Sequence, residues 1–298
     1  MLKYFLKKNL VNSLVLIIFS VFYAFSQNLY IKLLDGEVIK EIELEEYIAG
    51  VVSEEMSDKY PIEALKAQAV ISRTYLLWKI KTNKNNSYDI ENSVYNQVYK
   101  PCRSEKIKHA IEETKGKILT TFNGEIMPVF FHACCGGKTA IPSDVWGGNY
   151  NFISSIEDPY CKNSKYTHWE KKIPKDYLSQ LFGFKILKVE IIERDISGRA
   201  KFLQIIGENG IIKKFKGNEF RLKINGRKFY FHNPYIIPST LFDIEDNGNI
   251  VIMKGKGYGH GVGMCQEGAK KMAEIGFNYK EILKFYFPEL EIRNFYKN

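Results

Sequence analysis

Cysteine, histidine, tryptophan and proline are scarce in this chain. Its 298 residues include five cysteines, five histidines, three tryptophans and nine prolines. Five cysteines are too few for a disulfide-built scaffold, and an odd number leaves at least one thiol unpaired within the chain. With 45% hydrophobic and 26% charged residues, the composition excludes a disordered, collagen-like or low-complexity chain. The length suits one large domain or two of moderate size.

Long apolar runs are also missing, apart from one near the N-terminus. Lys3, Lys7 and Lys8 precede an apolar stretch over 11–25, which ends at Ala24-Phe25-Ser26. A basic region, a short apolar region and a small-x-small end are typical of a secretory signal. The run is shorter than the roughly 20 residues that a spanning helix needs. Residues 1–26 are therefore interpreted as a cleaved signal, with a retained membrane anchor or a buried core helix as the alternatives.

Acidic residues are fewer than basic ones, and the formal net charge is +9. A modest positive excess favours anionic partners such as wall polymers, acidic lipid surfaces or nucleic acid, or it aids solubility alone. Export argues against nucleic acid, and contact with a membrane is expected only if the N-terminal segment is retained. We therefore expect an exported protein of the cell envelope.

Hydrophobic periodicity predicts helices in the first part of the chain and again at its end. Apolar residues recur with helical spacing from Leu44 to Val52, and Pro61 suits the first turn of a second helix. Asn123-Gly124 and Asp35-Gly36 are hairpin turn signals. The expected elements are a hairpin over 28–43, helices over 44–56, 61–80, 105–115 and 266–286, a loop over 82–87, and strands over 117–121 and 127–132.

From about residue 183 to 255 the pattern changes to short β-branched and aromatic runs. Asn209-Gly210, Asn225-Gly226 and Asn247-Gly248 separate these runs, and such dipeptides predict antiparallel hairpins. We therefore expect an α+β fold with a β-rich insert over about 183–255. In this fold a helical segment packs on a β-rich body that has a substrate groove.

Glu55 is the first candidate for chemistry. On a helix over 44–56 it lies within the apolar stripe, whereas Glu54 lies at the edge of that stripe. A carboxyl on a buried face near a helix C-terminus has its pKa raised by desolvation and by the helix dipole. That is the profile of a general acid at neutral pH. The alternative is that the helix ends by Met56 and the Glu55 carboxylate reaches solvent.

Histidine and cysteine concentrate in the segment from Phe130 to Gly137. It places His132, Cys134 and Cys135 after a predicted strand, and Cys161 follows about 26 residues later. Imidazole and thiolate are zinc ligands, and His-x-x-Cys is a plausible local spacing. A Cys135–Cys161 disulfide and buried free thiols remain the alternatives.

Glycine alternates with other residues from Gly255 to Gly263. The spacing fits neither a phosphate-binding loop nor a dinucleotide fingerprint. Alternating glycines allow the backbone to approach something bulky closely, and they present His260 from a constrained loop. A polymer chain in a groove and a tightly packed structural turn both fit this pattern.

Four segments together resemble the stage II sporulation protein D family, which includes the amidase enhancers. The first two are 47–56, which ends in Glu55-Met56, and 63–75, which carries Gln68, Arg73 and Tyr75. The third is His132 to Gly137 with Asp144 to Gly148, and the fourth is Gly257 to Ala269. The match covers roughly 30–170 and 250–290, and all four segments occur in the family's order. Ser57 departs from the family pattern, which has proline there.

The resemblance implies a lytic transglycosylase that acts on peptidoglycan glycan strands, preferably strands without stem peptides. Glu55 matches the family's catalytic glutamate. One carboxyl suffices if the sugar's own 6-hydroxyl attacks the anomeric carbon, because no second carboxylate is then needed to activate water. Asp58 and Glu63 are the candidates for a second carboxylate. A non-catalytic wall-binding activator of an N-acetylmuramoyl-L-alanine amidase is the alternative function, and an envelope scaffold is the third.

The same resemblance suggests the remaining site residues. Some family members bind zinc near the groove, which implies His132, Cys135 and Cys161 as ligands of a structural zinc. Asp158 lies where related chains carry another cysteine, so this ligand set is incomplete, and Cys265 is expected only to pack. Arg73 taken alone is read as an ordinary surface side chain. The expected substrate-binding residues are Gln68, Arg73, Tyr75, His260 and Gln266.

Overall fold

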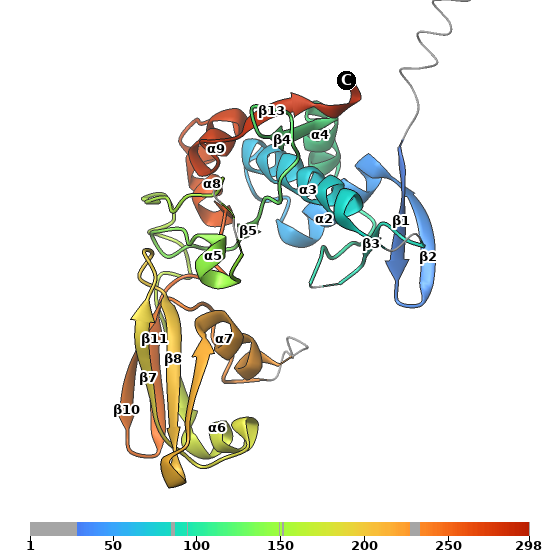
Figure 1. Ribbon diagram of the computed structural model, residues 1–298. Coiled ribbons are helices and arrows are strands. Elements are labelled where there is room, and N and C mark those ends of the chain that lie inside the picture. Colours follow the sequence, from blue (N-terminus) through green and yellow to red (C-terminus); the bar gives the residue numbers. More distant parts are fainter. Residues whose placement is uncertain are drawn as a thin grey trace, which may run out of the picture.

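The computed structural model describes residues 29–84, 87–93, 95–148, 150, 152–226 and 233–297 (Figure 1). The predicted signal or anchor over 1–26 lies outside these residues. Within the described ranges, no helix combines the length and apolar character needed to cross a bilayer. Helices and strands are mixed, and most strand pairs are antiparallel, which confirms the α+β class.

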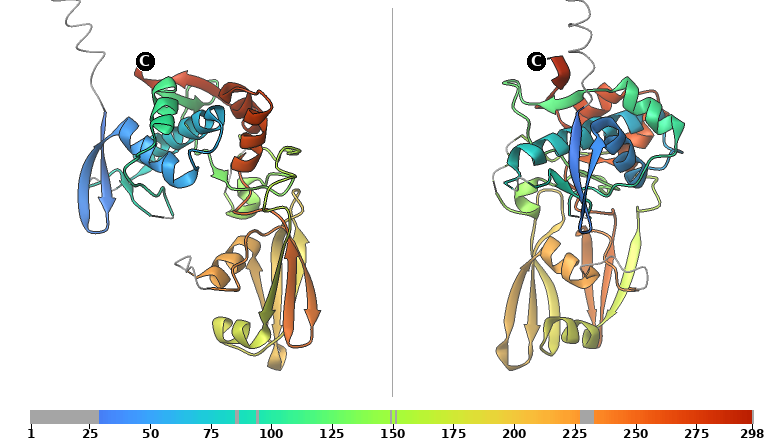
Figure 2. Two further views of the ribbon diagram at one scale, coloured as in Figure 1. Left: turned by 180° about the vertical axis from the view of Figure 1, so that it is seen from behind. Right: turned by 90° about the vertical axis from the view of Figure 1, so that its right-hand side faces the viewer.

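Two hydrophobic cores divide the described chain into a helical unit and a β unit. Figure 1 and the two views of Figure 2 show them one beyond the other, joined through the segment around the short helix α5 (Pro142–Val145). The helical unit contains β1 (Tyr30–Asp35), β2 (Val38–Glu43), α2 (Leu44–Glu55), α3 (Ile62–Thr82), β3 (Ile90–Glu91), α4 (Glu105–Glu113), β4 (Lys117–Thr120), β5 (Phe131–His132), β12 (Met264–Cys265), α8 (Gln266–Glu274), α9 (Tyr279–Tyr286), β13 (Glu291–Asn294) and the 3-10 turn η2 (Phe295–Lys297).

Both ends of the chain build the helical unit. Helix α3 is its central element, because it contacts α2, α4, α8 and α9. Strand β13 near the C-terminus pairs antiparallel with β4, and β12 pairs parallel with β5, where Cys265 lies opposite His132. The buried side chains of α2, such as Tyr47 and Val51, follow the predicted apolar stripe. As a result, the C-terminal end of α2 lies next to the start of α8.

In the sequence, the β unit lies between the N-terminal and C-terminal parts of the helical unit. Strand order β10-β11-β6 forms one antiparallel sheet, and β7-β8-β9 forms a second. The Asn209-Gly210 and Asn247-Gly248 turns connect neighbouring strands as predicted. The elements are β6 (Trp169–Pro174), α6 (Lys175–Phe182), β7 (Ile186–Arg194), β8 (Ala200–Gly207), the 3-10 turn η1 (Glu208–Gly210), β9 (Ile212–Lys216), α7 (Gly217–Asn225), β10 (Phe242–Asn247) and β11 (Ile250–Gly255).

The predicted hairpin around Asn123-Gly124 is wrong. The turn itself forms, with a 2.9 Å hydrogen bond from the Gly124 N–H to the Thr121 carbonyl. Strand β4 pairs with β13 instead of with 127–132, and only Phe131 and His132 of that stretch are extended in a ladder. Pro128 lacks the N–H that a continuous ladder needs, which explains why pairing does not extend back to the turn.

Two further boundaries differ from prediction. Asn225-Gly226 ends helix α7 instead of forming a hairpin, since a glycine with positive φ terminates helices as readily as it forms turns (φ 78° at Gly226). The predicted helix over 266–286 is two helices. Gly276 has φ 101°, and Asn278 with Glu281 forms a capping box that starts α9.

Candidate functional site

A cavity of about 520 Å³ lies where the helical unit meets helix α7 of the β unit. It receives Glu55 from the end of α2, Tyr75 from α3, and Gln266 from the start of α8. The full lining is Glu55, Tyr75, Tyr95, Asn96, Val129 to Ala133, Trp146, Asn218, Arg221, Leu222, Gly226, Tyr258 to His260 and Gln266. Glu55 is the sole carboxylic acid among these described residues.

Glu55 is the last residue of α2, and it is partly buried. Burial raises the pKa of the Glu55 carboxyl to about 7, because desolvation disfavours its charged form. The neighbouring Glu54 raises this pKa further, and a hydrogen bond from the Gln266 side chain opposes the shift. A carboxyl with this pKa holds its proton near neutral pH and can also release it, as a residue acting first as acid and then as base must.

The side-chain amides of Gln266 and Gln68 form a hydrogen-bonded chain that ends at the backbone oxygen of Glu55. Gln266 Nε2 lies 3.4 Å from the backbone oxygen of Glu55 and 3.3 Å from Oε1 of Gln68. Gln68 in turn donates to the Ser72 hydroxyl at 3.2 Å. Gln266 lines the cavity as predicted, whereas Gln68 is fully buried behind it. Gln68 therefore positions Gln266 and has no surface left for a substrate.

Arg73 does not join this group. Its side chain is fully buried, and its guanidinium binds the Glu45 carboxylate, with Nε 3.1 Å from each carboxylate oxygen. Nη1 donates to the Lys117 carbonyl at 2.9 Å. The surface reading and the substrate-binding reading of Arg73 therefore both fail. The residue joins the start of α2 to α3 and β4 inside the helical unit.

Aromatic rings follow one another along the cavity wall. Tyr75 contacts Phe130 edge-on at 6.3 Å between centroids, Phe130 lies 4.8 Å from Trp146, and Trp146 lies 5.0 Å from His260. Trp146 is 37% exposed, so part of the indole faces the opening. Tyr75 and His260 were predicted site residues, whereas Phe130 and Trp146 were not, although Trp146 lies within the Asp144 to Gly148 segment that carried the resemblance.

His132 and His260 differ in how their ring nitrogens are used. His260 Nδ1 accepts from the Val262 N–H at 3.0 Å, and its ring makes a second backbone hydrogen bond, to Phe131. His132 Nδ1 lies 3.0 Å from the Val262 carbonyl, so this nitrogen carries the proton. His132 Nε2 is buried with no hydrogen-bond partner among the described residues. Burial and the nearby Arg199 lower the pKa of His132 to about 3, so its imidazole is neutral.

The alternating glycines pack against the protein itself. A Cβ at Gly263 would lie 2.0 Å from the Phe130 carbonyl oxygen, and one at Gly261 would lie 2.5 Å from the Arg199 guanidinium. Both glycines have positive φ, which other residues rarely adopt. Of the two readings of this segment, the packed structural turn accounts for these contacts, and the turn is what holds His260 in the cavity wall.

A separate cluster of potential metal ligands lies beside the glycine turn. Cys135, Asp158, Cys161 and Cys265 are all buried, and their ligand atoms lie within 4.8 Å of one another. The Cys135 sulfur is 3.2 Å from the Cys161 sulfur and 3.1 Å from Asp158 Oδ2. Tetrahedral zinc with Zn–S bonds of about 2.3 Å would need sulfurs about 3.8 Å apart, so small adjustments would accommodate the ion.

This cluster corrects the predicted ligand set. His132 does not belong to it, whereas Cys265 and Asp158 do. All five cysteines are free, and a sulfur separation of 3.2 Å is too long for a disulfide bond of about 2.05 Å. The Asp158 carboxylate is 1% exposed and accepts from the Tyr286 hydroxyl, but no cationic side chain among the described residues pairs with it. A buried carboxylate without a cation is costly, and a bound metal ion would offset that cost.

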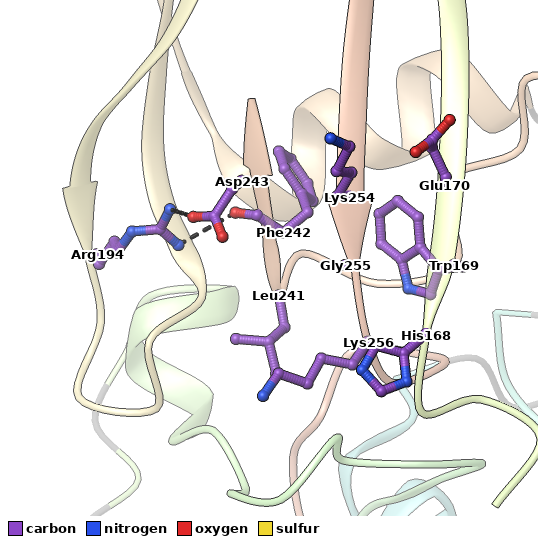
Figure 3. A pocket seen from close by; sticks show the side chains of 10 residues that line it. All are labelled: His168, Trp169, Glu170, Arg194, Leu241, Phe242, Asp243, Lys254, Gly255 and Lys256. Carbon is purple, nitrogen blue, oxygen red and sulfur yellow. Dashed lines mark hydrogen bonds and ion pairs between the residues drawn. The ribbon is translucent and has the colours of Figure 1, made fainter. Parts of the chain in front are cut away.

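A second pocket of about 530 Å³ lies within the β unit (Figure 3). Strand β6 places Trp169 and strand β11 places Lys254 around it, and Arg194 forms an ion pair with Asp243 at its edge. Neither Glu55 nor the thiol cluster reaches this pocket. Its charged groups of both signs lie on exposed strand faces, so the chemistry of the molecule is concentrated in the cavity that contains Glu55.

Comparisons with known proteins show which family this chain is similar to. The family model described as stage II sporulation protein matches residues 35–121. An uncharacterized protein of Brachyspira hyodysenteriae is 34% identical over 264 residues, which cover 86% of this chain and 68% of that protein. Stage II sporulation protein D of Bacillus amyloliquefaciens is 31% identical over 281 residues, 85% of this chain and 75% of the relative.

A third relative is the amidase enhancer of Bacillus subtilis, which is 25% identical over 288 residues. That match covers 81% of this chain but 39% of the enhancer. Together these matches define a protein with a role related to the cell wall. The chain belongs to the stage II sporulation protein D family.

Proposed function

We propose that this chain is a lytic transglycosylase that cleaves peptidoglycan glycan strands, with Glu55 as the single general acid and base. The observation that carries the proposal is the setting of Glu55, a partly buried carboxyl with a pKa of about 7 at the end of a cavity. A group titrating near neutral pH serves both proton transfers. Strands that lack stem peptides are the preferred substrate.

The reaction uses the substrate's own hydroxyl as the nucleophile. Glu55 donates its proton to the glycosidic oxygen as the bond to the anomeric carbon breaks. The carboxylate then takes the proton of the muramyl 6-hydroxyl while that oxygen bonds to the anomeric carbon, which leaves a 1,6-anhydro end and restores the acid. No water is consumed, so no second carboxylate is required.

The placement of the other candidate carboxylates supports this chemistry. Asp58 is exposed, and Glu63 is engaged with Lys66 and the backbone N–H of Tyr279. Neither lines the cavity. A hydrolase would need one of them opposite Glu55 to activate or replace water. The arrangement of a lone acid therefore favours the transglycosylase over a hydrolase.

The cavity wall suits a carbohydrate. The rings from Tyr75 to His260 offer flat apolar faces beside a polar acid. Gln266 adds an amide next to Glu55. These groups support glycan binding across the cavity.

The test uses residues 27–298 with purified glycan strands that lack stem peptides. Mass spectrometry of the products should reveal 1,6-anhydro ends with the wild-type chain and none with Glu55→Gln. Rates should fall as pH rises through about 7, since the protonated carboxyl is the reactive form. Intact strands after incubation with both proteins would refute the enzymatic proposal.

The second candidate function is that of a wall-binding activator of an amidase. The name of the Bacillus subtilis relative, amidase enhancer, favours it. In that case Glu55→Gln would bind glycan normally and would still stimulate an N-acetylmuramoyl-L-alanine amidase. Stimulation measured with both proteins in parallel separates the two functions, because the transglycosylase proposal ties activity to Glu55.

We further propose that zinc binds the cluster of Cys135, Asp158, Cys161 and Cys265 and has a structural role. Three thiolates and one carboxylate form a complete tetrahedral donor set. The ion would join the loop after β5 to the start of α8, and it would supply stability without entering the glycan chemistry.

We propose export as the route to the substrate. The segment over 1–26, interpreted as a signal or anchor, would deliver the protein to the cell envelope, facing the wall. Membrane contact would follow only from retention of that segment.

A further inference from the structure

Two arginines lie deep beside the cavity without a carboxylate partner. Arg199 is 1% exposed and Arg221 is 5% exposed. Among the described residues, no carboxylate oxygen lies within 4.0 Å of either guanidinium, although Arg73, equally buried, has Glu45. Arg199 has a structural role, because its two Nη atoms donate to the backbone carbonyls of Lys138 and Cys135.

Arg221 is different because it lines the cavity itself. Helix α7 brings its side chain toward the helical unit. Nε donates to the Ile237 carbonyl at 3.1 Å, and Nη1 lies 3.4 Å from Asn218 Oδ1. These contacts fix the guanidinium but leave its charge uncompensated. Burial lowers the pKa of Arg221 to about 10, so the group stays charged at neutral pH.

A buried cation without an anion is costly unless a ligand supplies the anion. Tyr258 favours the charged form of Arg221 but is a neutral phenol rather than a carboxylate, and the nearby Arg199 adds positive charge. Burial is the main cause that lowers the pKa of His260, and both arginines lower this pKa further. This side of the cavity therefore carries a positive potential. In a site from which most water is excluded, a guanidinium can form two parallel hydrogen bonds to a carboxylate, which makes a carboxylate its preferred ligand.

We propose that Arg221 binds the free lactyl carboxylate of a muramyl residue and thereby selects strands without stem peptides. This inference rests on the proposed glycan substrate and names the group that the cavity recognises. In a strand that still carries its peptide, the lactyl carbonyl is part of a neutral amide and cannot form the charged pair. In a stripped strand the same position carries a carboxylate that fits the guanidinium.

The test measures binding in the Glu55→Gln background, so that no ligand is consumed. The ligands are a glycan tetrasaccharide with free lactyl carboxylates and the same tetrasaccharide with the lactyl groups as methylamides. A hydrogen-bonded charge pair is worth roughly a 10- to 100-fold difference in affinity. We expect the acid form to bind that much more tightly, and we expect Arg221→Gln to remove the difference. Arg221→Lys should retain part of it.

The methylamide ligand reports whether each variant is folded, because its affinity should not change on substitution of Arg221. Arg194→Gln is the matched control, since this cation belongs to the same β unit but lies at the other pocket, paired with Asp243 (Figure 3). It should keep the full preference for the acid form.

Equal affinity of the unsubstituted cavity for acid and methylamide would overturn the inference, and so would an undiminished preference for the acid form in Arg221→Gln. Cleavage is scored separately with the wild-type Glu55. A chain that prefers the acid form but yields no anhydro ends would refute the transglycosylase and leave the role of Arg221 in place.

Discussion

The side-chain amide of Gln266 lies 3.4 Å from the backbone oxygen of Glu55, although 211 positions separate the two residues in the sequence. Gln266 opens helix α8 directly after β12, and Glu55 closes helix α2. The parallel pairing of β12 with β5 fixes this meeting point. The same short ladder therefore places His132, Gln266 and the candidate acid around one cavity.

The first prediction concerns the acid itself. Glu55→Gln keeps the shape of the side chain but cannot transfer a proton, so the rate of anhydro-product formation should fall about 10²- to 10⁴-fold. Affinity for the glycan should change little, because the amide still fills the same space. Product analysis and equilibrium binding on one protein sample check both parts. Asp58→Asn, a change at an exposed carboxylate nearby, is the control and should keep wild-type rates.

The second prediction concerns stability. Native Glu55 retains its proton up to about pH 7, whereas an ordinary glutamate releases it near 4.5. Ionisation of Glu55 therefore lowers the free energy of unfolding as pH rises from 4.5 to 7, and the loss is complete above pH 7. Glu55→Gln should be more stable than wild type by about 1–3 kcal/mol at pH 8 and nearly equal to it at pH 4.5. Urea denaturation at both pH values measures this; a constant difference would contradict it.

The third prediction concerns the thiol cluster. The purified chain should carry one zinc ion, and a chelator should lower its melting temperature. Cys161→Ser and Cys265→Ser should lose the metal, because each removes one of four donors. Cys102→Ser is the matched control, as this thiol lies outside the cluster. His132→Asn should keep its zinc, and metal loss in that variant would restore His132 to the ligand set.

The fourth prediction concerns the buried ion pair. Arg73→Met leaves the Glu45 carboxylate buried without its partner and should reduce the free energy of unfolding by about 3–5 kcal/mol. Arg194→Met breaks the more exposed pair with Asp243 and should cost less than about 1 kcal/mol. Denaturant titrations of the two variants make the comparison. Glycan affinity measured where Arg73→Met is still folded should match wild type, and a large loss would return Arg73 to the substrate-binding set.

Local pattern was sufficient for the elements with strong periodicity. The apolar stripe of α2 predicted both the helix and the inward position of Glu55, because the period of 3.6 residues links the two. The hairpins at Asn209-Gly210 and Asn247-Gly248 followed from turn chemistry in the same way. Asn225-Gly226 failed because the same dipeptide also ends helices, and only the preceding nine residues of α7 distinguish the two cases.

Partners that are distant in the sequence were not predictable from spacing. Nothing near Arg73 indicates that Glu45 will neutralise it, and nothing near Cys135 indicates that Cys265 will lie within reach. Arg221 was missed for the same reason. The role proposed for Arg221 depends on two features of the folded structure: no carboxylate among the described residues pairs with it, and the opposite wall of its cavity belongs to the helical unit. The one available signal for Arg221 in the sequence was its position on the buried face of a short amphipathic helix.

The chain's two ends share one core, with the β unit between them, and this order has a consequence for biosynthesis. A ribosome that has reached the end of β11 has already made Glu55, but Gln266, whose side-chain amide contacts the Glu55 backbone oxygen, has not yet been synthesised. The strand β12 and the amide of Gln266 come within the last 35 residues. The contact that joins the end of α2 to the start of α8 therefore forms late, after the whole β unit has been synthesised.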